Sequence, residues 1–184
     1  MDFHEFPKIP RLFRPIVITE KIDGTNVSVM VDENGRVTAG SHHRPITPED
    51  DNYGFAAWVR DHEAELLGFG PGQHYGEWWG QGINRGYDLT EKRFSLFNVS
   101  RWADCPECGR RRRPFCCEVV PVLSRCDTFS HKVIQGALNT LKKHGSVAAP
   151  GFMRPEGIVI FHERAGQLFK VTLEGDQEKG ANNG

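Results

Sequence analysis

The chain lacks a long apolar segment and an excess of charge of either sign. No apolar run approaches the ~20 residues that a membrane helix needs, and the N-terminal residues MDFHEFPKIP contain no apolar signal core. We therefore expect a cytoplasmic protein with no membrane contact. The 23 Lys and Arg residues nearly balance the 24 Asp and Glu residues, for a net charge of −1. Any contact with nucleic acid must then come from local basic clusters rather than from overall attraction.

Cysteine is also scarce, and its number is odd. Five cysteines without a secretion signal indicate reduced thiols. The candidate ligands for a structural Zn²⁺ are the CxxC pair Cys105 and Cys108 together with Cys116 and Cys117. The spacing of the second pair is wrong for a standard zinc ribbon, so a surface loop with unpaired thiols is the alternative. Between the pairs lie four arginines, residues 110–113, which either contact phosphates or form a solvated loop.

The pattern of apolar residues predicts an α+β fold of short, mostly antiparallel sheets flanked by a few helices. Strands are expected at residues 16–21, 25–32, 36–40, 73–79, 93–99, 116–123, 156–161 and 167–172. Residues 32–35, Asp-Glu-Asn-Gly, indicate a hairpin turn between the second and third strands. Helices are expected at residues 51–67 and 130–145, the latter with Ser130 as its N-cap and Gly145 at its end. We expect one domain over residues 1–184, with a polar tail at 173–184 and no C-terminal OB or helical module.

One short run, EKIDGTN at residues 20–26, places a lysine where it can become a nucleophile. Lys21 ends an expected strand, and Asp23 and Gly24 then favour a tight turn that aims an amine and a carboxylate into one pocket. A free lysine amine has a pKa near ~10.4 and is mostly protonated at neutral pH. It attacks an electrophile only after losing a proton, which requires a nearby cation or desolvation.

Five further elements follow the lysine in order: Ser41-His42-His43-Arg44, Tyr75-Gly76-Glu77-Trp78-Trp79-Gly80, Phe94-Ser95-Leu96-Phe97-Asn98-Val99, Glu156-Gly157-Ile158-Val159-Ile160 and Leu168-Phe169-Lys170-Val171-Thr172. From residue 16 to 172 the chain resembles the covalent nucleotidyltransferases, which include ATP-dependent DNA ligases, RNA ligases and mRNA capping enzymes. Their pattern is a KxDG nucleophile, an acidic strand, an aromatic strand, an EG strand and a terminal lysine strand. Each piece alone is weak evidence, whereas the ordered set is strong.

The residue five places after the lysine narrows the resemblance. DNA ligases and capping enzymes typically carry arginine there, whereas bacteriophage-type RNA ligases carry asparagine, and here it is Asn26. The chain thus looks like a compact, phage-encoded RNA ligase, an enzyme of RNA repair.

This resemblance implies an adenylation domain that uses ATP and Mg²⁺ or Mn²⁺. Lys21 would form a lysyl-AMP intermediate, and the AMP would pass to the 5′-phosphate of an RNA that is then joined to a 3′-hydroxyl, in a nicked duplex or a single strand. Lys170 would stabilise the phosphates as a second catalytic residue, and Asp23 and Glu156 would hold the metal through waters. The remaining implied nucleotide contacts are Glu20 at the base edge, Asn26, Arg44 at a phosphate, Glu77 at the ribose hydroxyls and Phe97 against the adenine.

The chain departs from the family pattern at two positions. His42 occupies the first arginine position of the basic motif, and Thr172 stands where a second lysine is usual, with Lys179 as a candidate replacement. Only twelve residues follow Thr172, so we expect a separate partner to help grip the nucleic acid. Two other functions stay open: a DNA ligase or other polynucleotide adenylyltransferase, and a nucleic-acid-binding module with a decayed catalytic centre.

Overall fold

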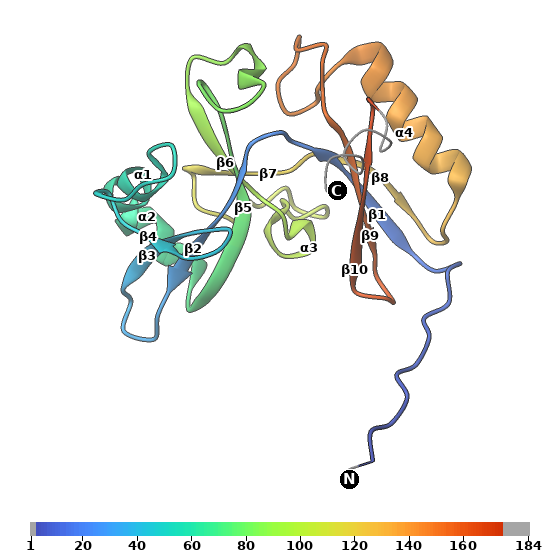
Figure 1. The fold of residues 1–184 in the computed structure, drawn as a ribbon, viewed down its shortest axis with the longest axis horizontal. Coiled ribbons are helices and arrows are strands. Elements are labelled where there is room, and N and C mark those ends of the chain that lie inside the picture. Colours follow the sequence, from blue (N-terminus) through green and yellow to red (C-terminus); the bar gives the residue numbers. More distant parts are fainter. Residues whose placement is uncertain (1–2, 175–184) are drawn as a thin grey trace, which may run out of the picture.

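A computed structural model of the chain describes residues 3–174 and contains two β-sheets packed face to face (Figure 1). The four-stranded sheet has the order β10-β9-β1-β8, and all of its neighbours are antiparallel. Its strands are β1 (Ile16–Lys21), β8 (Val122–Cys126), β9 (Gly157–His162) and β10 (Gln167–Thr172).

The six-stranded sheet has the order β4-β3-β2-β5-β6-β7. Its strands are β2 (Thr25–Val31), β3 (Val37–Ser41), β4 (Pro45–Ile46), β5 (Gly72–Gly80), β6 (Lys92–Leu96) and β7 (Cys117–Val119). Only the β6–β7 pair is parallel among the described strand pairs. The α+β fold with largely antiparallel sheets is therefore confirmed.

Helices cover the outer face of each sheet. On the four-stranded sheet, α4 (His131–His144) buries Leu138 and Leu141 against Ile18 and Ile158. On the six-stranded sheet, α1 (Phe55–Asp61), α2 (Glu63–Leu66) and η1 (Leu67–Phe69) bury apolar side chains against β2 and β5. Figure 1 shows these helices at opposite sides of the molecule. The two short helices η2 (Gly86–Asp88) and α3 (Val99–Trp102) lie in connections. No helix among residues 3–174 is long and apolar enough to cross a bilayer.

The inner faces of the sheets meet in a third apolar core, which includes Val17, Ile22, Trp79, Tyr87 and Phe152. The side chains of β1 contribute to two different cores, because successive residues in a strand point to opposite faces of the sheet. Ile16 and Ile18 pack beneath α4, whereas Val17 packs between the sheets. Lys21 has the same parity as Val17, so its side chain lies on the inner face.

Several expected elements are confirmed by the structure. Ser130 Oγ accepts a hydrogen bond from Val133 N (3.5 Å) and caps α4, and Gly145 ends that helix with φ of 80°. In the hairpin turn before β3, Asp32 O accepts from Gly35 N (3.0 Å), and Gly35 has φ of 77°. Each of these contacts lies within a few residues along the chain.

Three expected elements are wrong in their bounds. The strand expected at residues 93–99 ends at Leu96, and Val99 begins α3. The helix expected at residues 51–67 begins at Phe55 and is interrupted at His62. Asp51 lies before it, and its carboxylate accepts hydrogen bonds from the backbone of Ala56 (2.7 Å) and Ala57 (3.0 Å). The strand expected at residues 116–123 is divided between the sheets as β7 and β8, and Pro121 lies at the division, where it has no backbone N–H to donate.

Candidate active site

The turn after Lys21 crosses from one sheet to the other. β1 ends at Lys21 and β2 begins at Thr25, so residues 22–24 bridge the sheets, and Figure 1 shows this connection as the blue arch between β1 and β2. Ile22 is buried in the inter-sheet core. A Cβ atom at Gly24 would overlap Trp78 O and the Glu77 side chain. Glycine is therefore required here by the close approach of the turn to β5.

Lys21 forms an ion pair with Glu156, which directly precedes β9. The distance from Lys21 Nζ to Glu156 Oε2 is 2.5 Å, and Glu156 is only 8% exposed. The sheet register places Lys21 opposite Gly157 and Gly157 opposite Thr172. A Cβ atom at Gly157 would collide with the backbone of β10. The Glu-Gly pair thus delivers a carboxylate to the lysine and lets the next strand approach.

Glu77 on β5 is the second carboxylate at the site. Its Oε1 accepts a hydrogen bond from Gly24 N (2.9 Å), and the residue is 7% exposed. Burial raises the pKa of Glu77 to about 7, and the nearby carboxylates of Glu156 and Asp23 add to this rise. The hydrogen bond from Gly24 and the positive charge of Lys21 oppose it. Three carboxylates and one amine therefore face one another.

A loop between β5 and β6 fixes Asp23, the third carboxylate. Arg85 Nε donates to Asp23 Oδ2 (2.9 Å), and Asn84 Nδ2 donates to Asp23 Oδ1 (3.0 Å) and to Gly24 O (2.7 Å). Tyr87 Oη accepts from Asp23 N (2.8 Å). The sequence analysis missed these three residues. The sequence offers only a glycine-rich loop around them. The positive φ of Asn84 and Tyr87, which non-glycine residues adopt uncommonly, is visible only in the structure.

The inner face of the six-stranded sheet carries two exposed aromatic rings beside these groups. Asn26 on β2 is exposed and lies opposite Glu77. Phe97 directly follows β6, its N–H donates to Tyr75 O (3.0 Å), and its side chain is 39% exposed. Tyr75 has the same strand parity as Glu77 and is 57% exposed. The expected aromatic residue therefore has a neighbour, Tyr75, that the sequence analysis did not select.

Glu20 lies on the opposite face of β1 from Lys21, and its side chain is only 1% exposed. Its carboxylate accepts hydrogen bonds from Ser146 Oγ (2.6 Å), Val147 N (2.8 Å) and Ala148 N (3.0 Å). Burial raises the pKa of Glu20, and these three hydrogen bonds oppose the rise. The Glu20 side chain therefore anchors the segment after α4 and does not face the carboxylates around Lys21.

Two other candidate residues, Lys170 and Arg44, lie outside the cluster of carboxylates around Lys21. In the sheet register, Lys170 lies opposite Val159, and Val159 lies opposite Thr19. Thr19 is two residues before Lys21 on β1, so the side chains of Lys170 and Lys21 lie on the same face of the sheet. Lys170 is exposed, and its side chain makes no hydrogen bond or ion pair with another residue of the 3–174 range. Arg44 is exposed and pairs with Asp50 (Nη1–Oδ2 2.5 Å). His42 and His43, which precede Arg44, are exposed, and their two imidazole rings contact each other edge to face. Lys179 lies outside the described residues.

The structure does not support the zinc interpretation of the cysteines. Within residues 3–174, no group of three or more His, Cys, Asp or Glu side chains is placed to hold a metal ion. Cys105 Sγ donates to Glu107 Oε2 (2.8 Å), and Cys108 is exposed in the same loop. Cys116 Sγ lies 3.7 Å from Sγ of Cys117, which is buried in the core of the six-stranded sheet. Cys105 and Cys108 thus belong to an exposed loop, whereas Cys117 belongs to the core of the six-stranded sheet and Cys116 lies beside it.

The fold and the site together define a class of protein: a two-sheet domain in which Lys21, at the crossing between the sheets, lies among the carboxylates of Asp23, Glu77 and Glu156. The family model described as RNA ligase matches residues 14–172. The chain belongs to the RNA ligase family.

Solved structures of an RNA ligase from Naegleria gruberi share the fold. A lysine-to-alanine mutant with ATP and Mn has 18% identity and a TM-score of 0.58, and the match covers 88% of this chain and 49% of that chain. The same ligase with PPi has 16% identity and a TM-score of 0.55, with 88% and 50% covered. A mutant with AMP and Mn has 16% identity and a TM-score of 0.54, again with 88% and 50% covered. This chain thus spans about half the length of these ligases. No curated protein matches it.

Proposed function

We propose that the chain is an ATP-dependent RNA ligase in which Lys21 Nζ is the nucleophile. The observation that supports this most directly is the ion pair of Lys21 with Glu156, two residues 135 positions apart, beside Glu77 and the Asp23 turn. Membership of the RNA ligase family supports the reaction class. The ATP, AMP and PPi present in the structures of the Naegleria ligase support the choice of nucleotide.

The reaction has three steps. The lone pair of Lys21 Nζ attacks the α-phosphorus of ATP, a nitrogen–phosphorus bond forms, and the bond to the β-phosphate oxygen breaks to release pyrophosphate. An oxygen of the RNA 5′-phosphate then attacks the AMP phosphorus, and the lysine amine leaves. Finally a 3′-hydroxyl attacks the activated 5′-phosphate, loses its proton, and releases AMP.

Attack requires that Lys21 lose a proton, because an ammonium group has no lone pair. Glu156 Oε2, at 2.5 Å, is the nearest acceptor for that proton. The exposed Lys170 on the same sheet face offers a positive charge for the phosphate oxygens of the transition state, where fixed charges act most strongly.

A Mg²⁺ or Mn²⁺ ion would neutralise charge on the triphosphate and on the leaving pyrophosphate. Carboxylate oxygens are the hard ligands that such ions take, often through waters. Asp23 and Glu156 fit this role because a carboxylate oxygen can accept more than one hydrogen bond. The contacts of Asp23 with Arg85 and Asn84, and of Glu156 with Lys21, leave further acceptor positions for metal-bound waters.

The adenosine would lie on the inner face of the six-stranded sheet. Phe97 would stack on the adenine, Glu77 would accept from the ribose hydroxyls with Asn26 beside it, and the Glu20 backbone would approach the base edge. Arg44 would bind a phosphate of AMP or of the RNA 5′ end after release from Asp50.

We also propose the bacteriophage-type branch, because Asn26 stands at the position that distinguishes it. A role in repair of RNA in the cytoplasm, on nicked duplexes or single-stranded ends, follows from this assignment. Because the chain spans about half of the Naegleria ligase, a partner surface that grips the nucleic acid belongs to the same proposal.

The test of nucleotidyl transfer is covalent labelling. The chain is incubated with Mg²⁺ and ATP labelled at the α-phosphate, followed by intact mass measurement and mapping of the modified peptide. We expect one AMP on Lys21, no label on Lys21→Ala, and normal label on the control Lys132→Ala, whose side chain is exposed on α4. Unlabelled wild-type protein would favour the binding-only alternative and refute the proposal.

The later steps are tested with a pre-adenylated RNA strand. Lys21→Ala should seal it, since the nucleophile is needed only in the first step, and a folded variant that fails to seal would contradict these roles. Parallel assays on RNA and DNA nicks distinguish RNA ligation from DNA ligation.

A further inference from the structure

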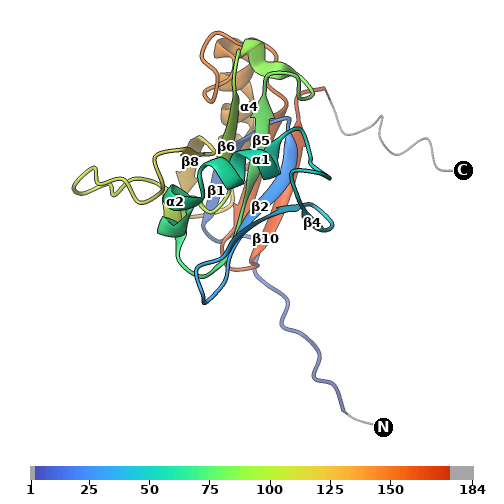
Figure 2. The ribbon, with the colours of Figure 1, turned by 90° about the vertical axis from the view of Figure 1, so that its left-hand side faces the viewer.

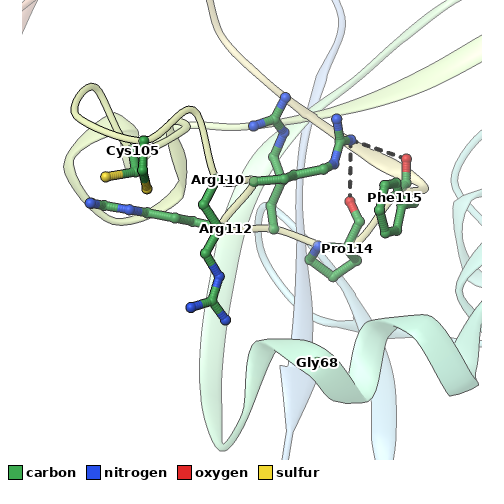
Figure 3. Close-up of a pocket in the computed structure, with 9 residues that line it drawn as sticks. Gly68, Cys105, Arg110, Arg112, Pro114 and Phe115 are labelled. Atoms are coloured by element: carbon green, nitrogen blue, oxygen red, sulfur yellow. Dashed lines mark hydrogen bonds between the residues drawn. The ribbon is translucent and has the colours of Figure 1, made fainter.

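The connection between α3 and β7, residues 103–116, stands out from the body of the molecule (Figure 2). It contains the four consecutive arginines. A hollow of about 640 Å³ lies on it, lined by Gly68, Cys105, Cys108, Arg110, Arg111, Arg112, Arg113, Pro114 and Phe115 (Figure 3). Four of these nine residues are cationic, one is a large aromatic, and none is acidic. Such a lining suits a polyanion that carries flat rings.

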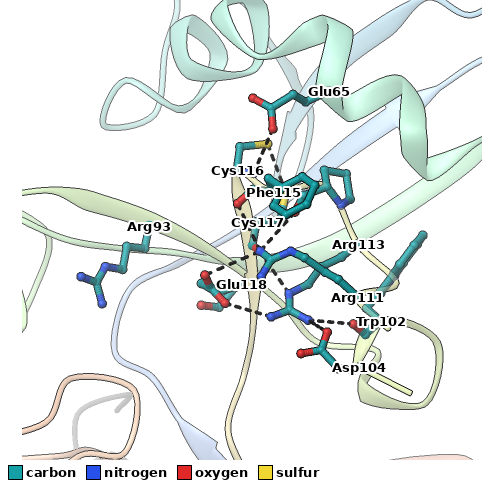
Figure 4. A network of polar contacts seen from close by, with 12 residues as sticks. Glu65, Arg93, Trp102, Asp104, Arg111, Arg113, Phe115, Cys116, Cys117 and Glu118 are labelled. Carbon is teal, nitrogen blue, oxygen red and sulfur yellow. Dashed lines mark hydrogen bonds and ion pairs between the residues drawn. The ribbon is translucent and has the colours of Figure 1, made fainter. Parts of the chain in front are cut away.

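The four arginines divide into two pairs by strand-like alternation. Arg113 donates to Asp104 Oδ1 (2.6 Å), to Cys117 O (3.1 Å) and to Glu118 Oε2 (3.1 Å), and its side chain is only 9% exposed. Arg111 donates to Cys117 O (2.6 Å) and to the backbone of residues 114 and 115. Figure 4 shows both guanidinium groups inside this network. The pair therefore holds the base of the loop in place, and its charges are largely matched by Asp104 and Glu118.

Arg110 and Arg112 are exposed and make no hydrogen bond or ion pair through their side chains within residues 3–174. The charge of Arg112 acts weakly on Glu107, whose pKa is lowered chiefly by a hydrogen bond from Cys105. A tight turn fixes the start of this segment, because Cys105 N donates to Arg110 O (2.9 Å) and Gly109 N donates to Cys105 O (2.7 Å). Two free cations are thus presented on a held loop.

Phe115 adds a platform for a flat ring. It is 83% exposed, and the Arg111 guanidinium lies 5.2 Å from its ring centroid. Phe115 and the exposed arginines Arg110 and Arg112 belong to the lining of the same hollow. In single-stranded nucleic-acid sites, aromatic rings stack with bases while cations contact the backbone.

We propose that Arg110, Arg112 and Phe115 form a binding surface for a single-stranded RNA segment outside the nucleotide site. The two guanidinium groups contact backbone phosphates, and an unstacked base lies on the free face of Phe115. Because the chain as a whole has a charge of −1, this local cluster supplies electrostatic attraction that the overall charge does not. The assignment of RNA as the strand rests on the proposed function.

The experiment measures binding of a labelled single-stranded RNA by fluorescence anisotropy over a range of salt concentrations, without ATP or metal. For single strands the slope of log K against log salt is about −0.7 for each neutralised phosphate. The double variant Arg110→Ala/Arg112→Ala should reduce the steepness of the slope by about 1.4. The matched control Arg36→Ala/Arg164→Ala removes two exposed arginines elsewhere and should leave the slope unchanged.

Two further variants separate charge from stacking. Arg110→Lys/Arg112→Lys should retain most of the slope, because the charges remain. Phe115→Ala should weaken binding about five-fold to about a hundred-fold with little change in slope, as expected for loss of one stacked base. All variants should keep the wild-type thermal midpoint, since these side chains make no internal hydrogen bonds.

The outcomes are decisive. Equal slopes and affinities for the alanine variants and the control would overturn the proposal and indicate a protein partner or no ligand at this surface. Lysyl-AMP formation is measured on the same preparations and should be unchanged in every variant. Absence of lysyl-AMP in the wild type would refute the proposed function, whereas the slope comparison would still test this surface.

Discussion

Replacement of Glu77 by glutamine should change how the stability of the protein depends on pH. Glu77 is 7% exposed, and burial raises its pKa from the ordinary value of 4.5 to about 7. In the unfolded chain the carboxyl group ionises near its ordinary pKa, whereas in the folded protein it keeps its proton until near pH 7. As the pH rises between these values, the folded state binds more protons than the unfolded state. The free energy of unfolding must therefore fall over that range.

The size of the effect follows from the difference in pKa. A shift of one unit corresponds to about 1.4 kcal/mol, so a rise of about 2.5 units lowers the free energy of unfolding by about 3 kcal/mol between pH ~4 and pH ~8. Glutamine cannot ionise and removes this dependence. The difference in unfolding free energy between wild type and Glu77→Gln should change by about this amount across the range.

Urea unfolding at a series of pH values, with linear extrapolation to water, measures this difference. Other titrating groups, such as the buried Glu20, contribute equally to both proteins and cancel. Glu33→Gln, in the exposed turn before β3, is the control and should give a profile parallel to that of the wild type. If Glu77→Gln also runs parallel to the wild type, the argument from burial of Glu77 is refuted.

Three further predictions concern the supports of the site. Ser146→Ala removes the donor to the Glu20 carboxylate and should lower the free energy of unfolding by about 1–3 kcal/mol in urea unfolding; a change below about 0.5 kcal/mol would contradict a buried hydrogen-bonded anchor. Gly157→Ala should displace β10 and lower stability by about 2 kcal/mol or more, with loss of lysyl-AMP in the labelling assay, and normal labelling would show that the strands can separate at no cost. Phe97→Ala should raise the ATP concentration needed for half-maximal labelling by roughly ten-fold with little change in the maximal rate, because stacking is mainly uniform binding; a slower maximal rate at saturating ATP would place Phe97 in the chemical step.

Contacts between residues close in the chain could be predicted from the sequence. The cap of α4 by Ser130, the hairpin turn at residues 32–35 and the turn after Lys21 depend on local propensity and on glycine at fixed positions. The α+β fold and the membership of the RNA ligase family follow from these local patterns and their order along the chain.

Boundaries that depend on packing were beyond local patterns. The sequence suggested one strand at residues 116–123, but the two halves join different sheets, since β7 pairs with β6 and β8 pairs with β1. The sequence also suggested a zinc site among the cysteines. Burial of Cys117 in a core and exposure of Cys108 in a loop separate the thiols, and neither property is visible in their spacing.

The sequence by itself determined the order of the segments around the proposed nucleophile Lys21 and the family to which the chain belongs. Only the tertiary structure decided that Glu156 pairs with Lys21, that Arg85 and Asn84 hold Asp23, and that Glu20 turns away to anchor the segment after α4. These contacts join residues from 61 to 135 positions apart. They depend on strand register and on which face is buried, and both are fixed only when the two sheets pack together.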